Sequence, residues 1–226
     1  MSQSCHAGSE PLPSLPDALI RYAKLDYAGA HRMLAPLADS GEAVAQEILG
    51  FMYARGEGVP RDGAAAFHWF TLAAQAGRPE AQFELGRIYR DGVGVAADGK
   101  AALSWLRRAA DQGKTDAYDA VAELYLGQSG IAADPAAASE WFLRAAEHGS
   151  AQAMYNIGLR HAQGQDGPRN EIEALMWFDL AYGDAVGSLR DTIASARMAL
   201  TEHLMPMQVQ MALVRSREWT RTHRAE

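Results

Sequence analysis

The sequence has little cysteine, no surplus of positive charge and no long apolar run. Cys5 is the only cysteine among the 226 residues, which excludes an intramolecular disulfide framework and a cysteine-ligated zinc site. The 21 lysines and arginines face 28 acidic residues, for a net charge of −7. Nucleic-acid binders present a basic face, so this balance argues against one. No apolar stretch approaches the roughly 18 residues of a membrane-spanning helix, so no membrane span is predicted.

The first 16 residues lack the basic start and the apolar stretch of a secretory signal. The sequence as written therefore predicts a flexible tail over residues 1–16 and a cytoplasmic protein. A periplasmic location stays open if an upstream signal peptide was omitted from the start.

Several residue types recur with a period of 36 residues. The tryptophans have this spacing, and so do sets of glycine, tyrosine and aspartate, with an asparagine in the fourth aspartate place. Such self-similarity indicates a repeat protein. The recurring residues are Trp69, Trp105, Trp141 and Trp177; Gly41, Gly77, Gly113 and Gly149; Tyr53, Tyr89 and Tyr125; and Asp62, Asp98, Asp134 and Asn170.

Each unit is predicted to form two helices. In the second unit, apolar residues between 81 and 89 recur at helical spacing, and Gly86 leaves room for a neighbouring backbone. Asp98 is placed to cap the second helix, and Gly113 to end it in a left-handed conformation. The repeated tryptophans share one register, which favours packing inside the repeats over ligand binding.

The pattern predicts an all-α protein whose terminal helices differ from the repeats because one side faces solvent. The predicted parts are an N-terminal capping hairpin (17–41), four repeats (42–77, 78–113, 114–149 and 150–183) and C-terminal capping helices (184–226), with helices over about 188–203 and 206–222.

The repeat unit resembles the Sel-one-like repeat, a relative of the tetratricopeptide repeat. The second unit carries this resemblance in Ala81, Leu85, Gly86, Tyr89, Gly92, Gly94, Val95, Asp98, Ala102, Trp105, Ala109, Ala110 and Gly113. The resemblance implies a right-handed α-solenoid of helix pairs. It also implies a non-enzymatic scaffold or adaptor that binds a protein or peptide. A monomer is expected, and self-association through an exposed end of the solenoid stays open.

Other motifs are weaker. The run from Gly94 to Lys100 spells G-x-x-x-x-G-K, but Ala101 replaces the hydroxyl residue of a phosphate loop, and the run coincides with a repeat turn. The histidines lack metal-ligand spacing, so neither a cofactor nor a metal is predicted. Near the end of the chain, Glu218 and Glu226 interrupt a basic run, which favours a solvated helix over a patch for an acidic partner or a membrane. That run consists of Arg215, Arg217, Arg221 and Arg224.

The resemblance places the first helix of each repeat on the concave face, where residues that vary between repeats would contact a partner. These positions hold Glu47, Phe51 and Arg55; Phe83, Arg87 and Arg90; Asp119 and Glu123; and Tyr155 and Leu159. The aromatic and arginine residues suit a peptide with apolar anchors and a carboxylate, and the acidic pair suits a basic residue. The convex face stays open as an alternative.

The leading hypothesis is therefore a protein-interaction scaffold that uses its concave face. The alternative is a secreted or periplasmic hydrolase of cell-wall or β-lactam substrates, or an envelope-binding protein, as described for some relatives. The sequence lacks an S-x-x-K motif and a recognisable Ser/His/Asp set, which favours the scaffold.

Overall fold

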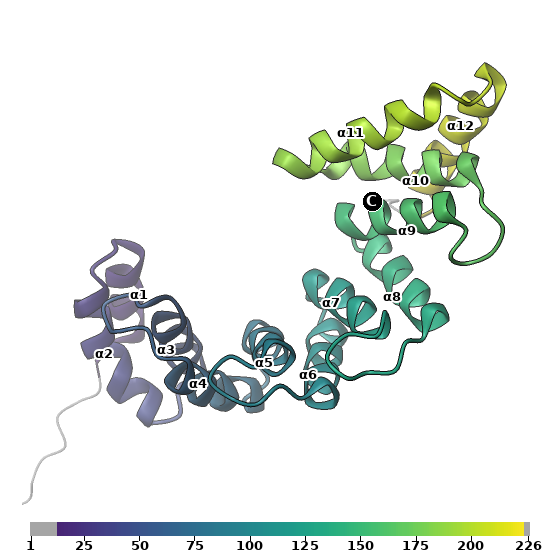
Figure 1. Ribbon diagram of the computed structural model, residues 1–226. Helices are drawn as coiled ribbons and strands as arrows, with labels where there is room; N and C mark the ends of the chain where they lie inside the picture. The colour runs from purple at the N-terminus through teal and green to yellow at the C-terminus, as the bar shows by residue number, and fades with distance from the viewer. Residues whose placement is uncertain (1–12, 224–226) are drawn as a thin grey trace, which may run out of the picture. The chain divides into compact units, whose positions relative to one another are not determined.

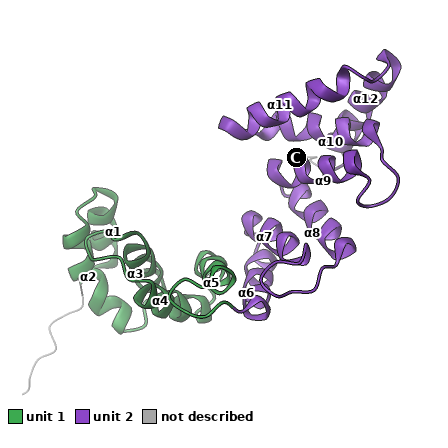
Figure 2. Ribbon diagram, viewed as in Figure 1, with its two compact units in different colours: residues 1–97 green, residues 98–226 purple. Residues whose placement is uncertain are grey.

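The computed structural model describes residues 13–223, which form twelve α-helices and no strand (Figure 1). This confirms the predicted all-α class. The chain divides into two compact units, residues 1–97 and 98–226 (Figure 2). Most of the predicted tail, with Cys5, lies outside the described residues, as do Arg224 and Glu226.

The first unit is a run of helices in which each packs on its neighbours in the chain, and the third also touches the fifth. Leu34, Leu49 and Met52 are fully buried in its core. Its helices are α1 (Leu15–Ala23), α2 (Tyr27–Asp39), α3 (Ala43–Arg55), α4 (Gly63–Gln75) and α5 (Pro79–Asp91).

The second unit continues the same neighbour-to-neighbour packing, which is the organisation of a repeat protein. Both of its last two helices pack against the tenth. They occupy the two segments near the C-terminus where the sequence predicts helices. The helices are α6 (Gly99–Asp111), α7 (Thr115–Tyr125), α8 (Pro135–Glu147), α9 (Ala151–Gln163), α10 (Glu171–Asp184), α11 (Gly187–Thr201) and α12 (Pro206–His223).

The periodic aspartates cap the second helix of each repeat, as predicted. Asp98 accepts hydrogen bonds from the backbone N–H groups of Lys100 and Ala101 at 2.9 and 3.0 Å. Such a cap stabilises a helix by about 1 kcal/mol. Asp62, Asp134 and Asn170 accept equivalent bonds.

The periodic glycines after each second helix are required by backbone conformation. Their φ angles lie in the left-handed region, and a Cβ added to any of them would meet nothing within 4 Å. It is thus the turn itself, not lack of space, that favours glycine here. The residues are Gly41, Gly77, Gly113 and Gly149.

A different glycine position, within the first helix of the first and fourth repeats, makes room for an aromatic ring. A Cβ at Gly50 would lie 2.6 Å from Cδ1 of Phe70, and a Cβ at Gly158 would lie 2.5 Å from Cδ1 of Phe178. Gly86 has the same register, and there the sequence predicts the approach of a neighbouring backbone. In the first and fourth repeats, the second helix of the same repeat instead supplies a buried phenylalanine.

The repeated tryptophans pack within the repeats. Trp141 and Trp177 are buried, whereas Trp69 and Trp105 are half-buried. Trp177 also lies edge-on to Trp219 of α12, with ring centroids 5.4 Å apart. These contacts support the interpretation that the tryptophans are packing residues.

Candidate partner-binding site

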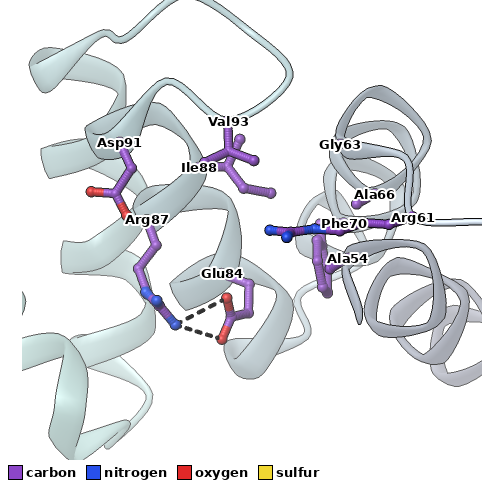
Figure 3. Close-up of a pocket in the computed structure, with 10 residues that line it drawn as sticks. All are labelled: Ala54, Arg61, Gly63, Ala66, Phe70, Glu84, Arg87, Ile88, Asp91 and Val93. Carbon is purple, nitrogen blue, oxygen red and sulfur yellow. Dashed lines mark hydrogen bonds and ion pairs between the residues drawn. The ribbon is translucent and has the colours of Figure 1, made fainter. Parts of the chain in front are cut away.

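A cavity of about 160 Å³ lies between α3, α4 and α5 in the first unit (Figure 3). The large apolar residues in its lining are Phe70 of α4, Ile88 of α5 and Val93 in the turn after α5. An engineered apolar cavity of roughly 150 Å³ accepts benzene, so this space suits one apolar side chain of a ligand. The residues that line it are Ala54, Arg61, Gly63, Ala66, Phe70, Glu84, Arg87, Ile88, Asp91 and Val93.

The charges around the cavity leave one guanidinium available. Glu84 lies 3.4 Å from Arg87, and Asp91 lies 2.7 Å from Arg90, so each acid has its own cation. The exposed Arg61 makes no side-chain hydrogen bond or ion pair with any described residue. Figure 3 shows its side chain reaching across the cavity toward α5. The site therefore combines an apolar pocket with one cation ready for a carboxylate.

One predicted residue of the first unit lines this cavity, and others contact its lining residues. Arg87 lines it directly. Phe51 packs edge-to-face on Phe70, with ring centroids 5.0 Å apart, and the Arg55 guanidinium lies 4.7 Å from the Phe51 centroid. Phe83 is half-buried under Arg87, at 5.8 Å. Arg90 does not line the cavity, but it forms an ion pair with Asp91, which does.

Glu47 is engaged inside the protein. Its carboxylate is buried and accepts hydrogen bonds from Nη2 and Nε of Arg78 at 2.7 and 3.1 Å. Arg78 is the N-cap residue of α5, so the pair joins consecutive repeats. A carboxylate held on both oxygens has little capacity left for a partner.

Asp119 of α7 occupies the same register in the third repeat, but its partner carries no charge. Its Oδ2 accepts a 2.5 Å hydrogen bond from the hydroxyl of Ser150, the N-cap residue of α9, while its buried Oδ1 has no hydrogen-bond partner. The pKa of Asp119 is raised to about 6, chiefly by burial; the hydrogen bond from Ser150 opposes this rise, and the charges of Glu123 and Asp116 add to it.

The other predicted residues of the second unit are partly buried or packed against neighbouring side chains. Glu123 of α7 and Leu159 of α9 are half-buried. The Tyr155 ring packs on Phe178, with centroids 5.4 Å apart.

Replacing Asp119 by asparagine is expected to make the protein more stable at pH 8 but not at pH 4. A folded-state pKa raised from 3.8 to about 6 means that the unfolded chain releases this proton first as the pH rises. The wild-type protein therefore loses roughly 2–3 kcal/mol of stability between about pH 4 and pH 7, and Asp119→Asn avoids that loss. Urea unfolding at both pH values measures the effect. Asp111→Asn, at an exposed acid of α6, is the control. Equal gains at both pH values would contradict the titration.

Of the residues that line the cavity, the sequence prediction names only Arg87, and it misses Phe70 and Arg61 among the others. Phe70 follows Trp69 at a position that is apolar in every repeat, so it reads as a core residue. Arg61 lies in the turn after α3, which the sequence assigns to backbone geometry. Its register holds Ala97 and Ala133 in the next two repeats. The fourth repeat has Arg169 at this register, so comparison of turn residues between repeats would not have distinguished Arg61.

The fold is that of an all-helical repeat protein with a ligand-sized cavity between repeats. The Sel1 (Sel-one-like) repeat model matches residues 43–77, 79–114, 115–150 and 151–182, more than half of the sequence. The chain therefore belongs to the Sel1 repeat family.

Three solved structures resemble the chain. A Sel1 repeat protein from Oxalobacter formigenes is 27% identical, with a TM-score of 0.75 over 89% of this chain and 84% of that one. The protective antigen c5321 of uropathogenic Escherichia coli is 23% identical, with a TM-score of 0.54 over 87% and 57%. A putative sel1 repeat protein from Klebsiella pneumoniae subsp. pneumoniae is 22% identical, with a TM-score of 0.50 over 81% and 89%. The curated proteins include no significant match.

Sel1 repeat proteins are generally protein-interaction scaffolds, and the fold is typically non-enzymatic. The hydrolase alternative has no support from the family or from these structures. Within residues 13–223, no helix is long and apolar enough to cross a membrane. The same residues contain no cluster of His, Cys, Asp and Glu that could hold a metal ion.

Proposed function

We propose that this protein is a non-enzymatic scaffold whose first unit binds a segment of a partner protein at the cavity between α3, α4 and α5. The site combines α3 and α5, the first helices of two consecutive repeats, with α4 and the turn before it. The family resemblance predicts that the first helices line the concave face. An apolar side chain of the partner enters over Phe70 and Ile88, and an acidic side chain pairs with Arg61.

The observation that carries this proposal is the unpaired Arg61 beside an apolar cavity of about 160 Å³. Arginine is enriched at binding hot spots, and its fork of donors matches a carboxylate. Phe51, Arg55 and Arg87 extend the same surface. The Asp119–Glu123 region stays a proposed second contact area for a basic residue.

Reversing the charge of Arg61 is expected to weaken partner capture by about tenfold or more, because a like charge then faces the bound carboxylate. The tagged full-length protein and its Arg61→Glu variant would be used for affinity capture from native cells, with quantitative mass spectrometry. Arg32→Glu is the matched control, because Arg32 is an exposed arginine on α2 that makes no ion pair with a described residue.

Recovery of the same partner by Arg61→Glu and by wild type would contradict the cavity as its site. Loss of the partner with Arg32→Glu as well would indicate long-range electrostatics instead. A folded wild-type protein that captures no saturable partner would argue against the scaffold function itself.

A further inference from the structure

Helix α12, the last described helix, has two apolar faces. Its inner face packs on α10, where Ala212 and Ser216 are buried and the Ser216 hydroxyl donates a 2.7 Å hydrogen bond to Asp179. Its outer face carries Met207, Met211 and Val214, which are 75%, 42% and 48% exposed. Their spacing of four and three residues places them in one stripe along the helix.

An apolar stripe is unexpected at this place. The end of a helical repeat array normally presents a polar outer face, because nothing stacks on it and solubility depends on it. Contiguous exposed apolar residues mark interaction surfaces. Methionine suits such a surface, because its flexible and polarisable side chain adapts to a partner.

The stripe runs into a charged hollow. Val214, Arg217, Glu218 and Arg221 line a surface hollow of about 310 Å³. Neither Arg217 nor Arg221 forms an ion pair with any residue the structure describes. Arg215, by contrast, turns toward α10 and pairs with Glu173. Two guanidinium groups and the carboxylate of Glu218 therefore line the hollow, which has one excess positive charge at the C-terminal end of the stripe.

We propose that the outer face of α12 docks an acidic amphipathic helix of a partner protein. The α12 outer face consists of Met207, Met211, Val214, Arg217 and Arg221. Apolar residues of the partner at helical spacing cover the two methionines and the valine, and a carboxylate of the partner enters the hollow between the arginines. The proposal is independent of the cavity in the first unit.

The charges disfavour a second copy of this chain as the occupant. A parallel pair of α12 helices sets Arg217 and Arg221 against the same residues of the other copy. An antiparallel pair centred between Met211 and Val214 sets Met207 against Glu218 of the other copy. Each arrangement leaves a charge repelled or desolvated without a partner.

A membrane surface is also disfavoured. Helices that lie on membranes combine a lysine- and arginine-rich face with tryptophan, phenylalanine or leucine. Here Glu218 separates the two arginines, and the apolar residues are methionine and valine.

The probe is a fluorescein-labelled helical peptide of about three heptads, with leucine at the a and d positions and glutamate at the e and g positions. Fluorescence anisotropy with the full-length protein is expected to show saturable binding. Met211→Lys and the double variant Arg217→Glu/Arg221→Glu should each weaken it about tenfold or more. A peptide with lysine in place of glutamate should prefer the double variant. Met198→Lys, at an exposed methionine on α11, is the matched control and should bind as wild type does.

Several results would overturn the proposal. One is no saturable binding of the acidic peptide up to about 1 mM, and another is equal binding of the acidic and the lysine peptides by the wild type. An equal loss of peptide affinity in Met211→Lys and Met198→Lys would also contradict the proposal. Dimerisation of the protein that Met211→Lys abolishes would assign the face to a second copy. Sedimentation with phosphatidylserine vesicles that depends on Arg217 and Arg221 would assign it to a lipid surface.

Discussion

Replacing Phe178 by alanine is expected to lower the free energy of unfolding by about 3–5 kcal/mol, the range for a buried phenylalanine. Phe178 is fully buried on α10, and its ring lies against Gly158 of α9 and Tyr155. The substitution removes the ring and leaves a cavity that the rigid helix pair cannot fill. Urea unfolding followed by circular dichroism measures the change. Leu143→Ala, at an exposed leucine on α8, is expected to lower the free energy far less.

A second substitution separates loss of the ring from general damage to the helix. Gly158→Ala alone should destabilise the protein by about 1–3 kcal/mol, because its Cβ would lie 2.5 Å from the Phe178 ring. In the Phe178→Ala background the same change should cost less, because the ring clash is gone and alanine favours helix, while the added Cβ still lies 3.2 Å from the backbone oxygen of Ala174. The third repeat pairs Ala122 with Phe142, so a methyl group can be accommodated where the helices adjust. If the effects of the two substitutions on the free energy of unfolding are additive, the proposed contact between the residue at position 158 and the Phe178 ring is wrong.

The helices and their order could be predicted from the sequence because the repeat shows each signal several times. The caps at Asp62, Asp98 and Asp134 each mark a helix start, and their 36-residue spacing makes a single misreading improbable. Both C-terminal helices were likewise predicted within two residues of the observed bounds. Local helix propensity and tertiary packing favour the same structure in these helices, so the sequence pattern is sufficient to predict them.

The site was predicted less completely, because its features depend on which side chains meet across repeats. The variable register predicts Arg87 and Phe51 as partner contacts, which stays a prediction; Arg87 lines the cavity and Phe51 packs on Phe70. The engagement of Glu47 by Arg78 depends on a contact between residues 31 positions apart, which spacing within one helix does not reveal. The availability of Arg61 depends on the absence of a partner in space, which only coordinates can show.

Arg160 shows how a departure from the repeat pattern carries information. Its register holds Met52, Ile88 and Leu124 in the other repeats, and all three are buried. Arg160 is nevertheless only 5% exposed. Its Nε donates a 2.7 Å hydrogen bond to Asp166 Oδ2, and a second nitrogen bonds Oδ1. A further bond of 3.2 Å reaches the backbone oxygen of Pro135, so a core position of α9 is linked to α8 and to the turn before α10.

Removing Asp166 is expected to destabilise the protein more than removing Arg160. Asp166→Ala leaves the buried Arg160 guanidinium without the carboxylate of its exposed partner, which costs about 1.5–3 kcal/mol. Arg160→Met introduces the residue that the first repeat has at this register, Met52, and Asp166 can then turn toward water. The substitution should therefore lower the free energy of unfolding by less than roughly 1.5 kcal/mol. The double variant should resemble Arg160→Met.

Urea unfolding at pH 7 measures all three proteins, with Asp111→Ala at an exposed acid of α6 as the control. The reverse order, with Arg160→Met the more damaging single change, would mean that the bond to Pro135 and the packing of the arginine stem matter more than its charge. The expected order would instead show that position 160 in the core of the fourth repeat accepts an apolar residue. In that case the ion pair serves to hold the loop between α9 and α10 in place.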